Sequence, residues 1–354
     1  RSDHESTTYS EAQEKLRKGM YVMIREGSSE KNLAALLPLV TDQTYKRCLF
    51  VVDDRSCSDL LRDGDIDAVV RKAIQLGLEP VRAVQLATIN TAEYLGVRGV
   101  GAVAPGYRAN LAVLSDLREL RTELVVHHGR LVARAGQPLF TPSHDAPPAL
   151  RHTMHIQPFP VDRLALAADT RHHPVIEIVP PQIITRSVQI APRVHAGRTE
   201  ADTERDLLKL VVVERHTASG NIGLGLVHGL RLQRGAIASS VAHDSHNIVA
   251  AGVNDPDLYL AIRELERLGG GLVAVDAGQV ISALPLPLAG LLSDQPLRDV
   301  VRQFEAVERA AASLGSPLPA PFATLSFLAL PVIPELRLTD RGLVDVRQFK
   351  LLAS

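Results

Sequence analysis

The stretch MYVMIREGSSEKNLAALLPLV, residues 20–40, decides the fold. Its first part, residues 20–24, is an apolar run with the length of a buried strand, and four polar or small residues (25–28) follow it. Residues 29–40 then have the apolar spacing of a helix. A buried strand that ends in polar residues and passes into a helix is typical of a parallel α/β unit.

The same alternation continues on both sides of this stretch. Residues 10–18 have the pattern of an amphipathic helix, with Ser10 as its N-cap. Residues 48–52 are a second apolar strand, and the polar residues 53–55 follow it. Two further helical segments are expected, at residues 66–76 and 80–95.

Three domains are predicted. Residues 1–96 form an α/β part, whose parallel strands present functional groups at their carboxyl ends. Residues 97–150 form a small β module, and the chain from 136 to 160 is rich in proline, histidine and small polar residues, as linkers are. Residues 161–354 have a separate α+β pattern, which includes a helix at 258–268 after Asp255 and Pro256.

The composition is that of an ordinary soluble globular protein. With 45% hydrophobic and 22% charged residues, 354 residues are enough for two or three domains. A net charge of -1 argues against a nucleic-acid or anionic-membrane partner and favours a small-molecule substrate. Cys48 and Cys57 are too few for a disulfide framework, and no apolar run reaches the length of a membrane span. We therefore expect a cytoplasmic protein.

His4 and Asp53 are the first candidate catalytic groups. A histidine and an aspartate at the ends of successive strands can hold a hydrolytic metal ion, which lowers the pKa of bound water. Such an aspartate can also move a proton to a leaving amine. The alternative is that Asp53 and Asp54 only cap a turn with solvated carboxylates, and the spacing alone favours that alternative.

Glu26 is the next candidate, because it also follows a predicted strand. Its carboxylate could orient an amide edge or ring nitrogen of a substrate, with Arg25 as its counter-ion. The alternative is a surface ion pair that contributes little to stability.

A third group lies in the stretch RGAIASSVAHDSHNIVAAG, residues 234–252. Two short apolar segments, 236–242 and 248–253, flank the polar residues 243–247, which would lie at a strand end or connection. Crowded polar side chains are costly to bury without partners or a ligand. The cluster therefore predicts a polar site, although a turn cap would use the same residues, and its spacing matches no closed zinc site.

Taken together, these residues resemble bacterial adenine deaminases of the amidohydrolase superfamily. The resemblance covers nearly the whole chain, and the motifs of its second half are specific to adenine deaminases. The motifs that carry it lie at residues 2–5, 25–28, 53–55, 87–90, 104–109, 213–216, 239–247, 286–290 and 325–334.

The resemblance implies a metal-dependent (β/α)8 barrel, of which residues 1–96 would be the last strands and helices. A small β module and an α+β domain specific to these enzymes would follow. The implied reaction is hydrolytic deamination of adenine to hypoxanthine and ammonia by metal-activated water, a step of purine salvage. The implied cofactor is Mn²⁺ or Fe²⁺, as a pair of ions in the complete enzyme, and the implied assembly is a homodimer.

The resemblance also implies roles for individual residues. His4 would follow the sixth barrel strand and Asp53 the eighth, and both would bind metal. The predicted catalytic residues are Asp53, His4 and Glu26. The predicted substrate-binding residues are Asp54, Arg25, Ser28, His243, Asp244 and His246, of which His243 and His246 would face the mouth of the barrel.

The chain departs from the pattern of the superfamily in three respects. The remaining metal ligands, which come from earlier barrel strands, are expected before residue 1. Val52 stands where a small hydroxyl residue is typical, and Asn110 stands where an aspartate is usual. Two alternatives therefore remain: a catalytically incomplete remnant that binds a purine or mediates association, and an amidohydrolase for another cyclic amide or amidine.

Overall fold

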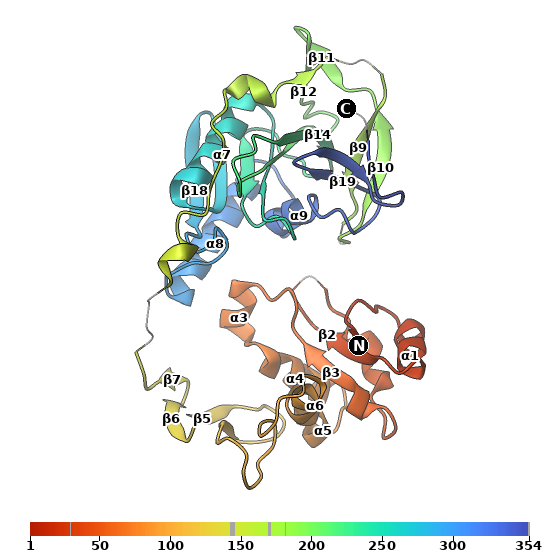
Figure 1. Ribbon diagram of the computed structural model, residues 1–354, viewed down its shortest axis with the longest axis vertical. Helices are drawn as coiled ribbons and strands as arrows, with labels where there is room; N and C mark the ends of the chain where they lie inside the picture. Colours follow the sequence, from red (N-terminus) through yellow and green to blue (C-terminus); the bar gives the residue numbers. More distant parts are fainter. Residues whose placement is uncertain (29, 142–145, 169–170, 181, 353–354) are drawn as a thin grey trace. The chain divides into compact units, whose positions relative to one another are not determined.

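The computed structural model describes residues 1–28, 30–141, 146–168, 171–180 and 182–352 (Figure 1). The chain divides into two compact units, Arg1–Ser143 and His144–Ser354. The predicted linker includes residues 142–145, which lie outside the described residues. The boundaries predicted after residues 96 and 150 stay predictions. None of the described helices is both long and apolar enough to cross a membrane.

A three-stranded parallel sheet organises the first unit (Figure 1). Strands β1 (Ser2–Asp3), β2 (Tyr21–Arg25) and β3 (Cys48–Val51) lie in this order, and both pairs are parallel. Val22 and Ile24 on β2 are fully buried in the core of the unit. Parallel strands joined through helices confirm the predicted α/β class for this part of the chain.

Two details of the predicted helices are wrong. Helix α1 (Tyr9–Arg17) is capped by Thr8, whose hydroxyl accepts from the amide of Glu11, and not by Ser10. Only Leu33–Leu36 of the segment predicted as one helix is α-helical. The chain continues there as a 3₁₀ turn, Leu37–Leu39, in which Pro38 has no N–H to continue an α-helical hydrogen-bond pattern. Ser29, where that helix was predicted to begin, lies outside the described residues.

Four further helices belong to the described part of the first unit, and the last three of them pack against β3. The predicted helices appear within a few residues of their expected bounds, whereas the helix at residues 57–63 was not predicted. The bounds are α3 (Cys57–Asp63), α4 (Ile66–Gln75), α5 (Pro80–Ala87) and α6 (Ile89–Tyr94). Four antiparallel strands follow: β4 (Leu111–Leu114), β5 (Thr122–His127), β6 (Arg130–Arg134) and β7 (Gln137–Pro138).

An eight-stranded sheet forms the centre of the second unit (Figure 1). Its central strand β13 (Leu207–Val213) is buried along its whole length. Leu208, Leu210 and Val212 point into one core, and Val211 and Val213 point into a second core on the other face. Successive side chains of a strand alternate between faces, so both faces of this sheet must be covered.

Helices cover both faces. Helix α7 (Asp255–Leu268) buries Leu258, Ile262 and Leu265 in one core, and helices α8 (Leu297–Ser313) and α9 (Pro321–Phe327) contribute to the other. The other strands of the sheet are β9 (His173–Ile178), β10 (Thr185–Ile190), β14 (Ile222–His228), β15 (Ala236–Ser239), β16 (Ile248–Gly252), β17 (Gly271–Asp276) and β18 (Gln279–Pro285). Two smaller sheets contain β8 (Leu166–Ala167), β11 (Arg193–His195) and β12 (Arg198–Glu200), and β19 (Leu336–Thr339), β20 (Gly342–Asp345) and β21 (Lys350–Leu351).

Arg337 is a fully buried arginine that joins distant parts of the second unit. Its guanidinium donates to the carbonyls of Ile333 at 2.8 Å, Phe327 at 2.9 Å and Ile183 at 2.6 Å. A weaker bond of 3.4 Å reaches the carbonyl of Pro334. Burial lowers the pKa of Arg337 to about 10, so the side chain is still a cation at neutral pH.

Glu214 follows β13 and holds the turn after it. Its carboxylate accepts from the backbone amides of His216, Thr217 and Ser219. Burial alone would raise the pKa of Glu214, but these amides and the hydroxyl of Ser219 outweigh it and lower the pKa to about 2. The ionised carboxylate therefore stabilises the folded state at neutral pH.

Glu214→Gln is expected to make the unfolding free energy less dependent on pH in acid. The folded-state pKa is depressed, so the stabilisation by Glu214 is present above the ordinary value of 4.5 and is lost as the pH falls towards about 2. Urea unfolding from pH 7 to pH 2 measures this difference between the two proteins. Glu204→Gln, at an exposed position, is the control and should keep the pH dependence of the unmodified chain.

Candidate active site

Three predicted functional residues lie just beyond the strands of the parallel sheet. His4 follows β1, Glu26 follows β2, and Asp53 comes two residues after the end of β3. Because β1, β2 and β3 run in the same direction, their carboxyl ends meet at one edge of the sheet. Sites of α/β proteins are commonly built at this edge.

The structure brings His4 and Asp53 together. Nε2 of His4 lies 3.9 Å from Oδ1 of Asp53 and 3.1 Å from Oε1 of Glu5. The side chains of His4 and Asp53 are 46% and 37% exposed, so both can be reached from solvent. Asp53 has φ of +54°, a left-handed conformation that few residues other than glycine, asparagine and aspartate adopt readily.

Arg25 is buried directly beside this pair, with its side chain 4% exposed. Its Nη1 donates to Oδ2 of Asp53 at 3.1 Å and to Oε2 of Glu5 at 3.3 Å. Nη2 lies 3.4 Å from Oε2 of Glu30, and Nε donates to Oδ1 of Asn32 at 3.3 Å. The guanidinium of Arg25 thus has four side-chain partners in the protein.

Glu26 does not pair with Arg25, which corrects the predicted counter-ion. One carboxylate oxygen of Glu26 binds Nζ of Lys72, and the other accepts from the amide of Leu33 at 3.1 Å. Side chains of consecutive residues along a strand point to opposite sides, so Arg25 and Glu26 face different surroundings. The catalytic role predicted for Glu26 stays a prediction.

Asp54 and Ser28 hold the loop after β2. Asp54 accepts from the amides of Ser28 at 3.2 Å and Glu30 at 3.4 Å. The hydroxyl of Ser28 donates to Asp59 and accepts from the amide of Ser56 at 2.8 Å. Both side chains therefore have structural partners, and the substrate contacts predicted for Asp54 and Ser28 stay predictions.

Glu30 is a further carboxylate that lies beside Arg25. Burial raises the pKa of its carboxyl, and the guanidinium of Arg25 opposes that increase. Asp54, Glu5 and Asp53 add negative charge around it, which raises the pKa further. Arg25 is therefore surrounded by more carboxylate charge than it can neutralise alone.

Gly27→Ala is expected to disrupt this loop. A Cβ at position 27 would lie 1.5 Å from Oδ1 of Asp54 and 2.8 Å from the carbonyl oxygen of Val52, so the Asp54 carboxylate would have to leave its amide partners. Overpacking of this kind costs typically about 1–3 kcal/mol. Thermal unfolding measures the change, and Gly27→Ala with an unchanged unfolding temperature would contradict the expectation.

The donor groups present fit part of a metal site. Among the described residues, no group of three or more His, Cys, Asp or Glu side chains could hold a metal ion. His4 and Asp53 offer an imidazole nitrogen and a carboxylate oxygen, which suit Mn²⁺, Fe²⁺ or Zn²⁺. Arg25 binds Oδ2 of Asp53, so Oδ1, the oxygen that faces His4, is the one that could bind an ion.

The polar cluster at residues 243–247 connects β15 to β16 in the second unit, as predicted. His243 is paired with Asp244 and stacks on Phe327 with ring centroids 5.4 Å apart. The side chains of His243 and Asp244 are 50% and 70% exposed. They could therefore meet a ligand, although their substrate-binding role stays a prediction.

His246 lies deeper in the cluster. Its carbonyl accepts from Nε of the buried Arg215. Burial and the charge of Arg215 lower the pKa of His246, which favours the neutral form of the imidazole. Within the described chain, Nδ1 of His246 and Oδ1 of the buried Asn247 have no hydrogen-bond partner. The prediction that His243 and His246 face the mouth of a barrel remains a prediction, because they belong to a different unit from Asp53.

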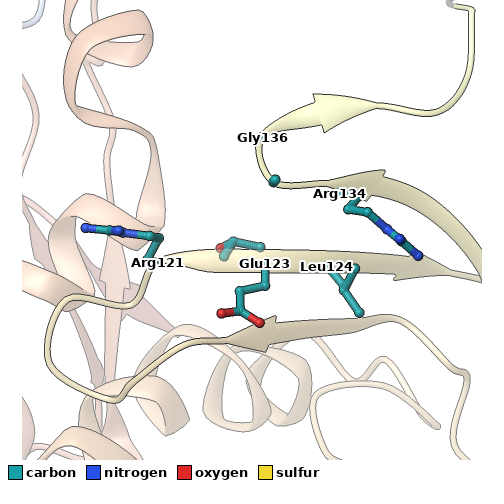
Figure 2. A pocket seen from close by; sticks show the side chains of 7 residues that line it. Arg121, Glu123, Leu124, Arg134 and Gly136 are labelled. Atoms are coloured by element: carbon teal, nitrogen blue, oxygen red, sulfur yellow. The ribbon is translucent and has the colours of Figure 1, made fainter.

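A cavity of about 810 Å³ lies on the antiparallel sheet of the first unit (Figure 2). Glu123 on β5 and Arg121, just before β5, line one part of the cavity. Arg134 at the end of β6 and Gly136 in the turn after it line another part. These side chains are exposed. The cavity contains none of the predicted site residues, so it supplies no candidate active site.

Comparison with known proteins supports the sequence resemblance. Residues 3–132 match the amidohydrolase family, and residues 182–350 match the adenine deaminase C-terminal domain. The chain is 60% identical over 351 residues to a protein named adenine deaminase from Dehalococcoides mccartyi. The resemblance to adenine deaminases is confirmed. The alignment includes 99% of this chain and 62% of the Dehalococcoides adenine deaminase, so the chain spans less than two thirds of that relative.

Other adenine deaminases align in the same way. The chain is 47% identical over 352 residues to adenine deaminase 2 of Carboxydothermus hydrogenoformans, with 99% of the chain and 62% of the relative covered. It is 46% identical over 349 residues to the adenine deaminase of Methanothrix thermoacetophila, with 98% and 60% covered. An amidohydrolase from Thermotoga maritima aligns with 38% of the chain and 43% of its own at 17% identity, and its TM-score of 0.23 is too low to compare folds.

Proposed function

We propose that the chain takes part in the hydrolytic deamination of adenine to hypoxanthine and ammonia. The observation that carries this proposal is the approach of His4 to Asp53, 3.9 Å apart at the carboxyl ends of parallel strands. The support from relatives is the 60% identity to the Dehalococcoides adenine deaminase over 99% of the chain. The reaction would belong to purine salvage in the cytoplasm.

The proposed fold of the first unit is the last part of a (β/α)8 barrel. The parallel order β1-β2-β3 and the amidohydrolase match over residues 3–132 support it. In this proposal residues 1–96 belong to the barrel, residues 97–150 form the small β module and linker, and residues 161–354 form the adenine deaminase C-terminal α+β domain. The complete enzyme would be a homodimer.

The proposed cofactor is Mn²⁺ or Fe²⁺, as a pair of ions in the complete enzyme. His4 through Nε2 and Asp53 through Oδ1 would hold an ion. When bound, such an ion acts as a Lewis acid and makes water reactive near neutral pH. Because Nε2 of His4 also lies 3.1 Å from Glu5, binding at this nitrogen requires Glu5 to give up that contact.

Asp53 would carry the proton in this reaction. Its carboxylate takes a proton from the attacking water and passes it to the amino group that leaves as ammonia. The new C–O bond forms at the purine carbon from which the C–N bond breaks, so water adds and ammonia departs. The other proposed catalytic residue is Glu26, and the proposed adenine contacts in the first unit are Asp54 and Ser28.

An assay of ammonia release tests the proposal. The 354-residue chain, loaded with Mn²⁺ or with Fe²⁺, is given adenine in one series and hydantoin-type rings in another. Release of ammonia from adenine alone supports adenine deamination. Turnover of the hydantoin rings alone supports an amidohydrolase for other cyclic amides. Adenine binding without turnover, measured by calorimetry, supports a purine-binding module instead.

A further inference from the structure

We infer that Arg25 is a positioning residue, whose guanidinium fixes the Asp53 carboxylate so that Oδ1 faces His4. The inference rests on the proposed function, because it concerns the geometry of the proposed catalytic aspartate. It replaces the substrate contact predicted for Arg25 with a contact inside the protein.

Arg25 forms hydrogen bonds to two carboxylates through one nitrogen. Nη1 donates at 3.1 Å to Oδ2 of Asp53 and at 3.3 Å to Oε2 of Glu5. The side chain of Arg25 is 4% exposed, whereas those of Asp53 and Glu5 are 37% and 60% exposed, so these charge-assisted hydrogen bonds lie at the boundary between the interior and solvent. The donors of a planar guanidinium have a fixed geometry, so these contacts constrain the direction of the Asp53 carboxylate more closely than a flexible ammonium group would.

The orientation of the Asp53 carboxylate depends on its two neighbours, Arg25 and His4. The side chain of Asp53 is 37% exposed, so packing against the protein holds only part of its surface. The two oxygens of Asp53 are divided between two partners, with Oδ2 on Arg25 and Oδ1 3.9 Å from Nε2 of His4. Without Arg25 the carboxylate is free to rotate and to turn Oδ1 away.

Asn32 and Glu30 hold the guanidinium of Arg25 in place. Asn32 accepts from Nε at 3.3 Å and Glu30 lies 3.4 Å from Nη2, so the guanidinium is itself held in place. A group held by buried partners can orient a second group more accurately than a mobile surface cation. These contacts engage all three nitrogens of the guanidinium with protein groups, which fits a role through Asp53.

Arg25→Gln and Arg25→Lys test the inference in the full 354-residue chain. Gln cannot reach two carboxylates, so kcat for ammonia release from adenine is expected to fall about 100-fold, the usual cost of misplacing a catalytic group by about 1 Å. KM should change less than kcat, because the substrate contacts are unchanged. Lys keeps one charged contact and should restore part of kcat. Arg71→Gln, a half-buried arginine that binds Asp67 and two backbone carbonyls, is the matched control and should keep the parental kcat.

A crystal structure of each variant gives a second, independent measurement. The expected result is that Oδ1 of Asp53 leaves its place opposite His4 in Arg25→Gln. If the carboxylate stays within about 0.5 Å of that place in Arg25→Gln and in Arg25→Lys, the inference is overturned. A lower unfolding temperature with the parental kcat also overturns it, since that is the result of a purely structural role. If the parent releases no ammonia, the proposed function fails while the crystal structures still decide the role of Arg25.

Discussion

Replacing Asp53 with Asn is expected to lower kcat for adenine deamination by about 10²–10⁴-fold, the contribution typical of a general acid–base group. Asn cannot accept and release a proton as a carboxylate does. It keeps the size of the side chain and also tolerates the left-handed backbone found at position 53, with φ of +54°. The carbonyl oxygen of Asn can still accept from Arg25, so the free energy of unfolding should fall by no more than about 1–2 kcal/mol.

Steady-state ammonia release and thermal unfolding measure the two effects of Asp53→Asn. Asp42→Asn is the control, because it makes the same chemical change at a side chain that is 81% exposed and paired with Arg82. The control should keep the parental kcat and the parental unfolding temperature. Parental ammonia release by Asp53→Asn would show that the proton is carried by another group.

Replacing Arg337 with Met is expected to have the largest effect on stability. Met has a similar length but no donors, so the carbonyls of Ile183, Phe327 and Ile333 lose their partner in a dry interior. An unsatisfied buried acceptor costs about 1–3 kcal/mol, which predicts a loss of about 3–5 kcal/mol after partial relaxation. For a unit of this size the unfolding temperature should fall by about 10 °C.

Calorimetry of the full chain measures the effect of Arg337→Met on the second unit. Arg302→Met is the control, since the side chain of Arg302 is 76% exposed and its ion pair with Asp299 is on the surface. The control should change the unfolding free energy by less than about 0.5 kcal/mol. Equal unfolding temperatures for the two variants would mean that water or relaxed backbone replaces the Arg337 bonds.

The sequence was sufficient to predict the local elements that carry the candidate site. An apolar run followed by polar residues located β2 and β3 to within one residue at each end. The resemblance placed His4 and Asp53 at the carboxyl ends of barrel strands, and the structure brings their side chains to 3.9 Å. Helix α7 begins at Asp255 and ends at Leu268. Pro256 near its start and Gly269 after its end had predicted these limits.

Contacts between residues far apart in the chain could not be predicted. The pairing of Glu26 with Lys72 depends on how α4 packs, and a local pattern favoured Arg25 instead. Arg337 is polar and was not recognised as a core residue, because its partners near residue 183 lie 154 positions earlier in the sequence. The sequence pattern also did not predict the order of the eight strands in the sheet. That order depends on which strands pair with one another, and many of the pairs are far apart in the chain.

The buried bonds of Arg337 also limit when the second unit can be finished during biosynthesis. Ile183 and Arg337 are 154 positions apart, and the hydroxyl of Thr185 bonds to the carbonyl of Leu336 across 151 positions. A ribosome that has made the early strands still has to release nearly the whole carboxyl-terminal segment before these ends can meet. While those 154 residues are being made, the early strands lack these partners, and unpaired strand edges of this kind favour association with other polypeptides.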